Sequence, residues 1–311
     1  MTETTSDLNR AFTPCARYHV MHETNYTYQS AVSLSQQYLH LSPAEFIYQH
    51  VEAQQISILP AEQENIAGQD YFGNNTRHIA ITVPHQSLIV NSEFTVTLGQ
   101  RLGSEELKGS LSWEVLRDTV THSKIRATQD ACRFLFASPH VSCSKQLRDY
   151  ALESFTPARE HLDAAMDLTQ RIFTDFEFDP TATEISTPLE QVFEGRRGVC
   201  QDFAHLMIGC LRSIGLPARY VSGYILTHPP EGQPRMIGAD ASHAWVSIYC
   251  PKFGWIDFDP TNRCLVQHEH ITLGIGRDFS DVTPLSGIVL GGGEQKLEVK
   301  VTVTPMALIS S

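Results

Sequence analysis

The sequence lacks any apolar run approaching the roughly 20 residues that a membrane-spanning helix needs. Residues 1–7 lack the basic and apolar regions that make up a secretory signal, and no internal repeat or low-complexity segment follows them. Contents of 41% hydrophobic and 19% charged residues are ordinary for a globular protein. We therefore expect a globular protein that stays in the cytoplasm.

Basic residues are in the minority, because 23 Lys and Arg face 35 Asp and Glu, which gives a formal net charge of −12. Proteins that bind nucleic acid need clustered Lys and Arg to displace counterions, and anionic membranes attract the same residues. We therefore expect neither nucleic acid nor a membrane among the partners of this chain. The charge leaves the oligomeric state open.

The seven cysteines form no Cys-x-x-Cys pair, and their odd number favours free thiols in a reducing compartment over a disulfide framework. His268-Glu269-His270 looks like part of a zinc motif but has no second ligand pair at a recognisable spacing. We interpret it as a polar loop or strand edge. Gly291-Gly292-Gly293 lacks the Lys-Ser/Thr of a phosphate loop. The sequence therefore predicts no metal and no cofactor.

Residues 16–98 alternate short β-rich runs with polar turns. This spacing is typical of an antiparallel β-sandwich, and we predict such a domain over residues 1–105. The expected strands are 18–28, 33–41, 54–59 and 78–83, with one or two more in 87–98. No residue of this region resembles a reactive site.

Helical and mixed patterns follow, and the predicted fold class is α+β. We expect a helical connecting region over 106–160, a second domain over 161–285 with helices packed on an antiparallel sheet, and a C-terminal strand segment over 286–311. A short helix is expected after Thr187, with Thr187 as its cap and Pro188 at its first position. The other expected helices are 146–155, 161–173 and one from residue 200, and the strands are 218–226, 242–249 and 254–260.

The helix that opens at Cys200 carries the first chemical signal. Apolar residues recur at positions 203, 207, 210, 211 and 214, and this spacing places Cys200 in the first helical turn. Free backbone N–H groups and the positive end of the helix dipole favour a thiolate there, and the same groups can hold an oxyanion. The alternative is a structural role, because an ordinary free cysteine packs as a small buried hydrophobe.

Two later strands supply partners for a reactive thiol. His243 lies in the run 242–249 and Asp259 near the end of 254–260, and neighbouring antiparallel strands can hold the two side by side. An imidazole that takes the thiol proton creates a strong nucleophile, and a carboxylate fixes the orientation of the imidazole. Asp257 competes for the carboxylate role, because residues 257 and 259 share one face of a strand.

These segments resemble the transglutaminase-like superfamily of papain-type cysteine enzymes. The matching pieces are Gly198-Val199-Cys200-Gln201-Asp202-Phe203-Ala204, Ser242-His243-Ala244-Trp245-Val246, and Gly254-Trp255 through Asp259-Pro260-Thr261-Asn262. Residues 18–28, Leu41-Ser42-Pro43 and Asp70-Tyr71-Phe72-Gly73-Asn74 look like the β domain that precedes the catalytic domain in bacterial members. The resemblance covers most of the chain and implies a papain-like catalytic domain over 161–285.

By this resemblance Cys200 is the nucleophile, His243 is the general base and acid, and Asp259, which precedes Pro260, is the orienting carboxylate. Weaker candidates for the substrate cleft lie near the motifs, and Asp202 also suits the helix N-terminus electrostatically. These cleft candidates are Asp202, Tyr224, Asp240 and Trp245, and Trp245 belongs either to the core or to the cleft wall.

The oxyanion site is less complete. Animal transglutaminases place a tryptophan upstream of the nucleophile to help stabilise the oxyanion, whereas the only upstream tryptophan here is the distant Trp113. We expect the Cys200 N–H to be one oxyanion donor, and the sequence does not identify the second.

The expected function is cleavage or transfer of amide bonds through a thioester acyl-enzyme, as in a protease, an amidase, a deamidase or an acyltransferase. The partners implied are a peptide or protein amide substrate and, for transfer, an amine acceptor. Cleft access and water exclusion decide between hydrolysis and transfer, and the lack of a calcium motif favours hydrolysis. The alternatives are a catalytically silent protein of the same fold that acts as a protein-interaction module and, less favoured, a zinc-binding module.

Overall fold

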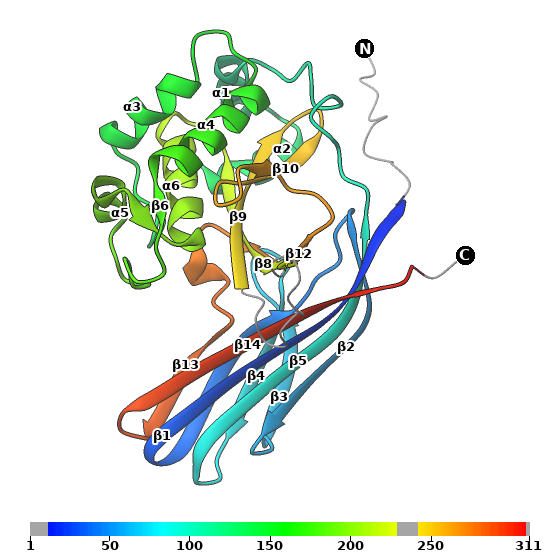
Figure 1. Cartoon of the computed structure of the whole chain (residues 1–311), viewed down its shortest axis with the longest axis vertical. Helices are drawn as coiled ribbons and strands as arrows, with labels where there is room; N and C mark the ends of the chain where they lie inside the picture. The colour runs from blue at the N-terminus through cyan, green and yellow to red at the C-terminus, as the bar shows by residue number, and fades with distance from the viewer. Residues whose placement is uncertain (1–11, 229–241, 309–311) are drawn as a thin grey trace.

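The computed structural model describes residues 12–228 and 242–308. The chain forms an elongated β domain and a mixed domain in which helices gather beside a second sheet (Figure 1). The α+β class predicted from the sequence is confirmed. Across the described ranges, no helix combines the length and apolar character needed to cross a membrane.

The β domain is an antiparallel sheet of seven strands in the order β2-β5-β1-β4-β3, with β13 and β14 also paired to β1. The strands from the N-terminal region are β1 (Pro14–Ser42), β2 (Gln49–Leu59), β3 (Glu64–Gln69), β4 (Asn75–Ile81) and β5 (His85–Gly99). The C-terminal residues supply β13 (Leu285–Gly291) and β14 (Gln295–Met306), so the two ends of the chain share one sheet.

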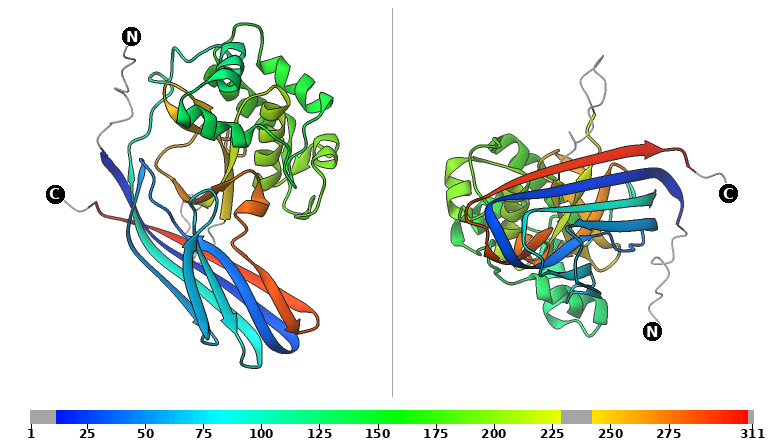
Figure 2. Two further views of the ribbon diagram at one scale, coloured as in Figure 1. Left: turned by 180° about the vertical axis from the view of Figure 1, so that it is seen from behind. Right: turned by 90° about the horizontal axis from the view of Figure 1, so that it is seen from below.

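Strand β1 reverses its direction near residues 29–31 and thereby joins two layers. Its first part pairs with β14 and β5, whereas its last part pairs with β13 and β4. The chain turns at the same place between β13 and β14. This turn contains Gly291, Gly292 and Gly293 with φ of 95°, 88° and 66°, a conformation that other residues rarely adopt. The sheet therefore curls over a single apolar core, and the view from below shows its bends nested within one another (Figure 2).

Alternating side chains explain why these strands pack as they do. Along β1, Tyr18 and Val20 point into the core from one layer, and Leu39 and Leu41 point into it from the other. The intervening residues 19, 21 and 40 lie on the opposite faces. The core of the β domain is thus built from a period of two that is already visible in the sequence.

The mixed domain is centred on α6 (Cys200–Ser213), whose residues 202–212 are all buried. A helix that is buried all round belongs in the middle of a core, and α6 packs against one face of a five-stranded antiparallel sheet of order β11-β10-β9-β8-β12. The strands are β8 (Ala218–Ile225), β9 (Ser242–Cys250), β10 (Gly254–Asp259), β11 (Cys264–Leu265) and β12 (His270–Gly276).

Shorter elements complete the mixed domain. The helices around α6 are α1 (Trp113–His122), α2 (Arg126–Ala131), α3 (Lys145–Ser154), α4 (His161–Asp175) and α5 (Leu189–Gly195), with 3₁₀ turns η1 (Cys132–Phe134) and η2 (Phe279–Asp281) and the short strands β6 (Glu177–Phe178) and β7 (Arg197–Gly198). One detail of the prediction is wrong: α5 starts at Leu189 with Pro188 as its N-cap residue, and Thr187 Oγ1 instead accepts a hydrogen bond from Glu184 N.

Two amide side chains of the β domain hold the edge strand β12. Gln49 donates to the Thr272 carbonyl at 2.8 Å and accepts from Thr272 N at 2.9 Å. Asn74 makes the same two contacts with the backbone of Ile275, at 2.7 and 2.8 Å. These side chains take the place of a neighbouring strand, so the two domains are joined through hydrogen bonds from side-chain amides to the backbone of β12 as well as through apolar contacts.

Candidate active site

Cys200 is the first residue of α6, and its side chain is half-buried. The first hydrogen bond of the helix runs from Phe203 N to the Val199 carbonyl, so the N–H groups of residues 200–202 precede the helical ladder. Such groups and the helix dipole favour a negative charge at this end of the helix. The predicted position of Cys200 in the first turn is therefore confirmed.

The start of α6 is fixed by Asp202. Its carboxylate accepts hydrogen bonds from Val199 N at 2.8 Å and Thr183 Oγ1 at 2.6 Å. A Cβ on Gly198 would lie 2.6 Å from the same carboxylate, so a glycine is needed where the carboxylate folds back. Burial raises the pKa of Asp202 against these two hydrogen bonds, which lower it. Asp202 thus caps the helix that carries Cys200.

His243 lies at the start of β9, opposite Gly223 of β8, and its Nε2 is 2.7 Å from Asp259 Oδ2. Burial alone would lower the pKa of His243, but hydrogen bonds and charge interactions with Asp259 and Cys200 outweigh it and raise the pKa to about 10. Because Nε2 is engaged by Asp259, Nδ1 is the ring nitrogen left for Cys200. The imidazole therefore lies between a thiol and a carboxylate.

Asp259 ends β10 and is fully buried. Its Oδ2 faces Nε2 of His243 at 2.7 Å, Nε2 of His270 at 2.9 Å and Nδ2 of Asn262 at 2.7 Å. Its Oδ1 accepts from the backbone N–H groups of Thr261 and Asn262. Burial alone would raise the pKa of Asp259, but these partners, above all the two histidines, hold it well below its usual range. The carboxylate therefore stays ionised in a buried site.

Asp257 has a different partner, although it shares a strand face with Asp259. Its Oδ2 is 2.7 Å from Arg101 Nη1 and accepts a hydrogen bond from Trp245 Nε1 at 3.3 Å. A cavity of about 120 Å³ adjoins this ion pair, and neither Cys200 nor His243 lines it. Of the two aspartates that periodicity left open, only Asp259 contacts His243 in the structure.

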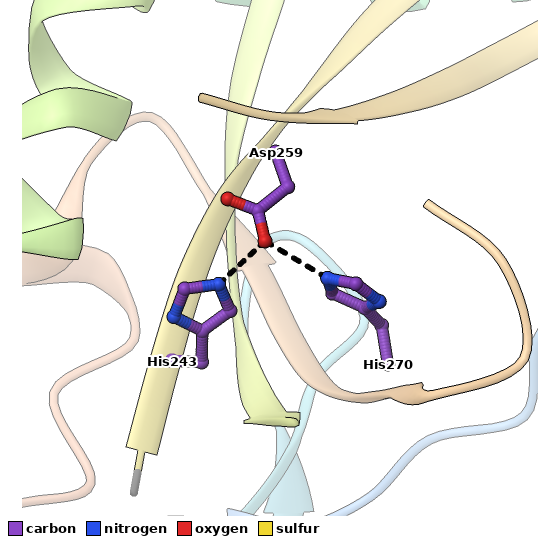
Figure 3. Close-up of side chains that lie close together, drawn as sticks. All are labelled: His243, Asp259 and His270. Carbon is purple, nitrogen blue, oxygen red and sulfur yellow. Dashed lines mark hydrogen bonds and ion pairs between the residues drawn. The ribbon is translucent and has the colours of Figure 1, made fainter. Parts of the chain in front are cut away.

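His270, the first residue of β12, is a member of the site that sequence reasoning missed. It is buried and shares Asp259 with His243, as the close-up shows (Figure 3). The interpretation of His268-Glu269-His270 as a polar loop or strand edge fits the place of His270 at the start of the edge strand β12, but it assigned no contact to the side chain. A histidine at the start of an edge strand was visible in the sequence, but its contact with Asp259 depends on how β12 is placed beside β8.

The nitrogen and oxygen atoms of His243, Asp259 and His270 lie within 4.8 Å of one another, which brings together three potential metal ligands. Two histidines and a carboxylate form a donor set that zinc accepts. Here the same atoms are already joined by hydrogen bonds of 2.7 and 2.9 Å. We interpret the cluster as a hydrogen-bonded one, and the predicted lack of a metal stays a prediction.

Of the four cleft candidates, the structure buries Tyr224 and Trp245 and places Asp202 at the helix N-terminus, its alternative role. Tyr224 is buried in the core shared with the β domain, where its hydroxyl lies 2.8 Å from His22 Nδ1, so it does not line an open groove. Trp245 is fully buried behind the histidines and does not form a cleft wall. Asp202 caps α6 as described above. Asp240 lies outside the described residues.

Comparison with known protein families gives two matches. Residues 148–260 match the transglutaminase-like superfamily, and residues 18–97 match the bacterial transglutaminase-like N-terminal region. An uncharacterized protein of Mycobacterium tuberculosis is 36% identical over 307 residues, which are 96% of this chain and 96% of that protein. One of Mycobacterium leprae is 30% identical over 298 residues, which are 94% of this chain and 99% of that protein.

Two further relatives carry functional descriptions. A protein-glutamine gamma-glutamyltransferase of Pseudomonas aeruginosa is 35% identical over 97 residues, which are 31% of this chain and 14% of that protein. A crystal structure from Cytophaga hutchinsonii, whose description suggests a cysteine protease, has a TM-score of 0.73 at 20% identity and covers 95% of this chain and 92% of its own. This second likeness shows that the fold extends over both domains.

Proposed function

The chain belongs to the transglutaminase-like superfamily, and we propose that it is a cysteine-dependent enzyme that attacks amide bonds through Cys200, His243 and Asp259. One observation carries this proposal: His243 is hydrogen-bonded to Asp259 at 2.7 Å, and interactions with both Asp259 and Cys200 raise its pKa. A catalytically silent interaction module has no need for this arrangement of a thiol, an imidazole and an ionised carboxylate.

The charges at the site favour a reactive thiol. With a pKa of about 10, His243 is protonated at neutral pH and donates from both ring nitrogens. A protonated imidazole stabilises a neighbouring thiolate, and the N-terminus of α6 does the same. Asp259 supplies the negative charge that keeps the imidazole protonated and oriented.

The acylation step follows from these positions. The Cys200 sulfur attacks the amide carbonyl carbon, and the N–H groups at the start of α6 stabilise the resulting oxyanion. The new carbon–sulfur bond stays, the carbon–nitrogen bond breaks, and the proton on His243 passes to the departing amine. The products of this step are a thioester on Cys200 and a free amine or ammonia.

The second step releases the acyl group. Water or a second amine attacks the thioester while neutral His243 takes its proton, which regenerates the thiolate and the protonated imidazole. Water gives hydrolysis and an amine gives acyl transfer. The gamma-glutamyltransferase among the relatives supports the side-chain carboxamide of glutamine as one acyl donor to test, beside peptide amides.

The proposal is tested by trapping the acyl-enzyme. The full chain is incubated with glutamine-containing peptides and peptide amides, with and without a primary amine, and intact-protein mass spectrometry follows the adduct on Cys200. We expect an adduct, release of ammonia or amine, and a loss of turnover of at least about a thousandfold in Cys200→Ala. Cys210→Ala, in which a buried cysteine of the same helix is changed, is the matched control.

Full turnover in a folded Cys200→Ala variant would contradict the assignment. A wild-type protein that forms no adduct with any of these amides, with Cys200 no more reactive than the other cysteines, would favour the interaction module instead. The partitioning between hydrolysis and transfer is read from the same samples, because the added amine appears in the product only when transfer occurs.

A further inference from the structure

The Asp259 carboxylate is shared by two histidines, and of these two described residues His243 is the one on which Cys200 acts electrostatically. His243 and His270 approach the same oxygen, Oδ2, at 2.7 and 2.9 Å from different strands (Figure 3). Their ring centroids are 5.9 Å apart. The mechanism proposed above uses His243 and Asp259 but assigns nothing to His270.

The protonation of His270 follows from its partner. An ionised carboxylate only accepts hydrogen bonds, so His270 carries its proton on Nε2. Burial lowers the pKa of His270, and the positive charges of His243 and Arg101 lower it further, against the opposing effect of Asp259. His270 is therefore neutral and donates a hydrogen bond without competing with His243 for the negative charge of Asp259.

Of the two ring nitrogens of His270, only Nε2 has a hydrogen-bond partner among the described residues, namely Asp259. Its Nδ1 is buried and has no hydrogen-bond partner among the described residues, which is unfavourable for a buried polar atom. The ring packs edge-on against Trp245 with centroids 5.2 Å apart. An apolar residue of similar shape would satisfy that packing without leaving a nitrogen unpaired.

The backbone that carries His270 is also fixed. His270 opens β12, which pairs with β8 on one side and is held on the other by the Gln49 and Asn74 side chains of the β domain. The donor atom is thus placed by the contact between the two domains. An imidazole on a rigid strand holds its partner more precisely than one on a loop does.

We propose that His270 is a positioning residue of the candidate active site, whose Nε2–H holds the Asp259 carboxylate in the orientation that pairs it with His243. This inference rests on the proposed function. Without the His270 donor, Asp259 keeps its contacts with Asn262 and the Thr261 backbone, but Oδ2 is no longer held between the two rings. The orientation of His243 toward Cys200 then becomes less well defined.

Two substitutions separate the hydrogen bond from the packing. His270→Phe keeps a ring beside Trp245 but removes the donor, whereas His270→Gln removes the ring but can place an N–H near the original Nε2. The rate of iodoacetamide alkylation of Cys200 is measured against pH in the wild type, in both variants and in His243→Ala. Thermal unfolding by circular dichroism checks that each full-length variant is folded.

We expect His270→Phe to slow Cys200 alkylation at pH 7 by about tenfold or more, the change that corresponds to losing one hydrogen bond to a charged group. Its half-maximal alkylation rate should occur at a higher pH than in the wild type, and His270→Gln should restore both values to within about threefold. Retained reactivity in a folded His270→Phe variant, or equal losses in the Phe and Gln variants, would overturn the inference.

The same data keep the two proposals apart. If wild-type Cys200 is strongly activated and His243→Ala removes the activation, the proposed function stands, and the His270 variants alone decide this inference. If wild-type Cys200 reacts no faster than the exposed Cys143, the proposed function fails, and the positioning role fails with it.

Discussion

At the scale of single residues, the His243–Asp259 pair places opposite charges where almost no water reaches. The exposed fractions of the two side chains are 7% and 0%. Burying an ion costs several kcal/mol unless an opposite charge and hydrogen bonds replace the lost water. The partners of Asp259 supply that replacement, so the pair stays charged while one ring nitrogen of His243 remains available to Cys200.

The pair predicts a specific pH dependence of stability. The pKa of His243 is about 10 in the folded protein and about 6.5 in an unfolded chain, so the folded state binds more protons between these values. The stabilisation from His243 is therefore complete below about pH 6.5 and is lost as the pH rises toward 10. We expect the difference in the free energy of unfolding between wild type and His243→Gln, measured by urea denaturation, to shrink over this range.

Below neutral pH, the stability contribution of Asp259 changes with pH in the opposite direction to that of His243. Because the folded-state pKa of Asp259 is depressed, its contribution is present above its unfolded value of about 3.9 and is lost as the pH falls below that value. For the alkaline side, the charged pair is contradicted if the free energies of unfolding of wild type and His243→Gln differ by the same amount from pH 6 to pH 10.

The sequence identifies some of these residues and not others. Cys200 and His243 stand in short motifs at the start of a helix and of a strand, where a local pattern is informative. Strand periodicity leaves Asp257 and Asp259 open, and the family resemblance selects Asp259; the pairing of Asp257 with Arg101, 156 residues away, is visible only in the structure. His270 depends on strand placement in the same way. Their roles in catalysis stay predictions.

At the scale of elements, β12 shows how an edge strand is protected. Its free side is met by Gln49 and Asn74, each of which satisfies one backbone N–H and one carbonyl. An unpaired edge would expose these groups to other chains. The sequence pattern predicts the neighbouring strand 218–226 but not β12, and the amide side chains that complete this edge come from a distant part of the chain.

Gln49→Leu tests this clamp. The substitution leaves the buried N–H and carbonyl of Thr272 without their partner, and each unsatisfied group costs about 1–3 kcal/mol. We therefore expect the free energy of unfolding in urea to fall by about 2–6 kcal/mol. The control is Gln69→Leu on the exposed strand β3. This substitution should change the free energy of unfolding by less than about 0.5 kcal/mol. Unfolding of both variants at the same urea concentration would contradict the role of Gln49.

At the scale of the whole molecule, the β domain and the mixed domain are joined in one structure. The strands β13 and β14 follow the mixed domain and return to pair with β1, and β12 carries His270 beside the domain contact. Sequence patterns predict the α+β class and most strands, because these are local properties. They do not predict that the two chain ends share a sheet, because that pairing joins residues almost 290 positions apart. The cytoplasmic location stays a prediction.

The most direct test of the central claim is the rate of Cys200 alkylation by iodoacetamide across pH 5–10, mapped together with the other six cysteines by mass spectrometry. We predict that half-buried Cys200 reacts faster than exposed Cys143 at pH 6, well below the pKa of about 8.5 of an ordinary free cysteine, and that His243→Ala abolishes this advantage. If the seven rates simply follow exposure, and His243→Ala leaves Cys200 unchanged, the paired thiol and imidazole do not form an active centre.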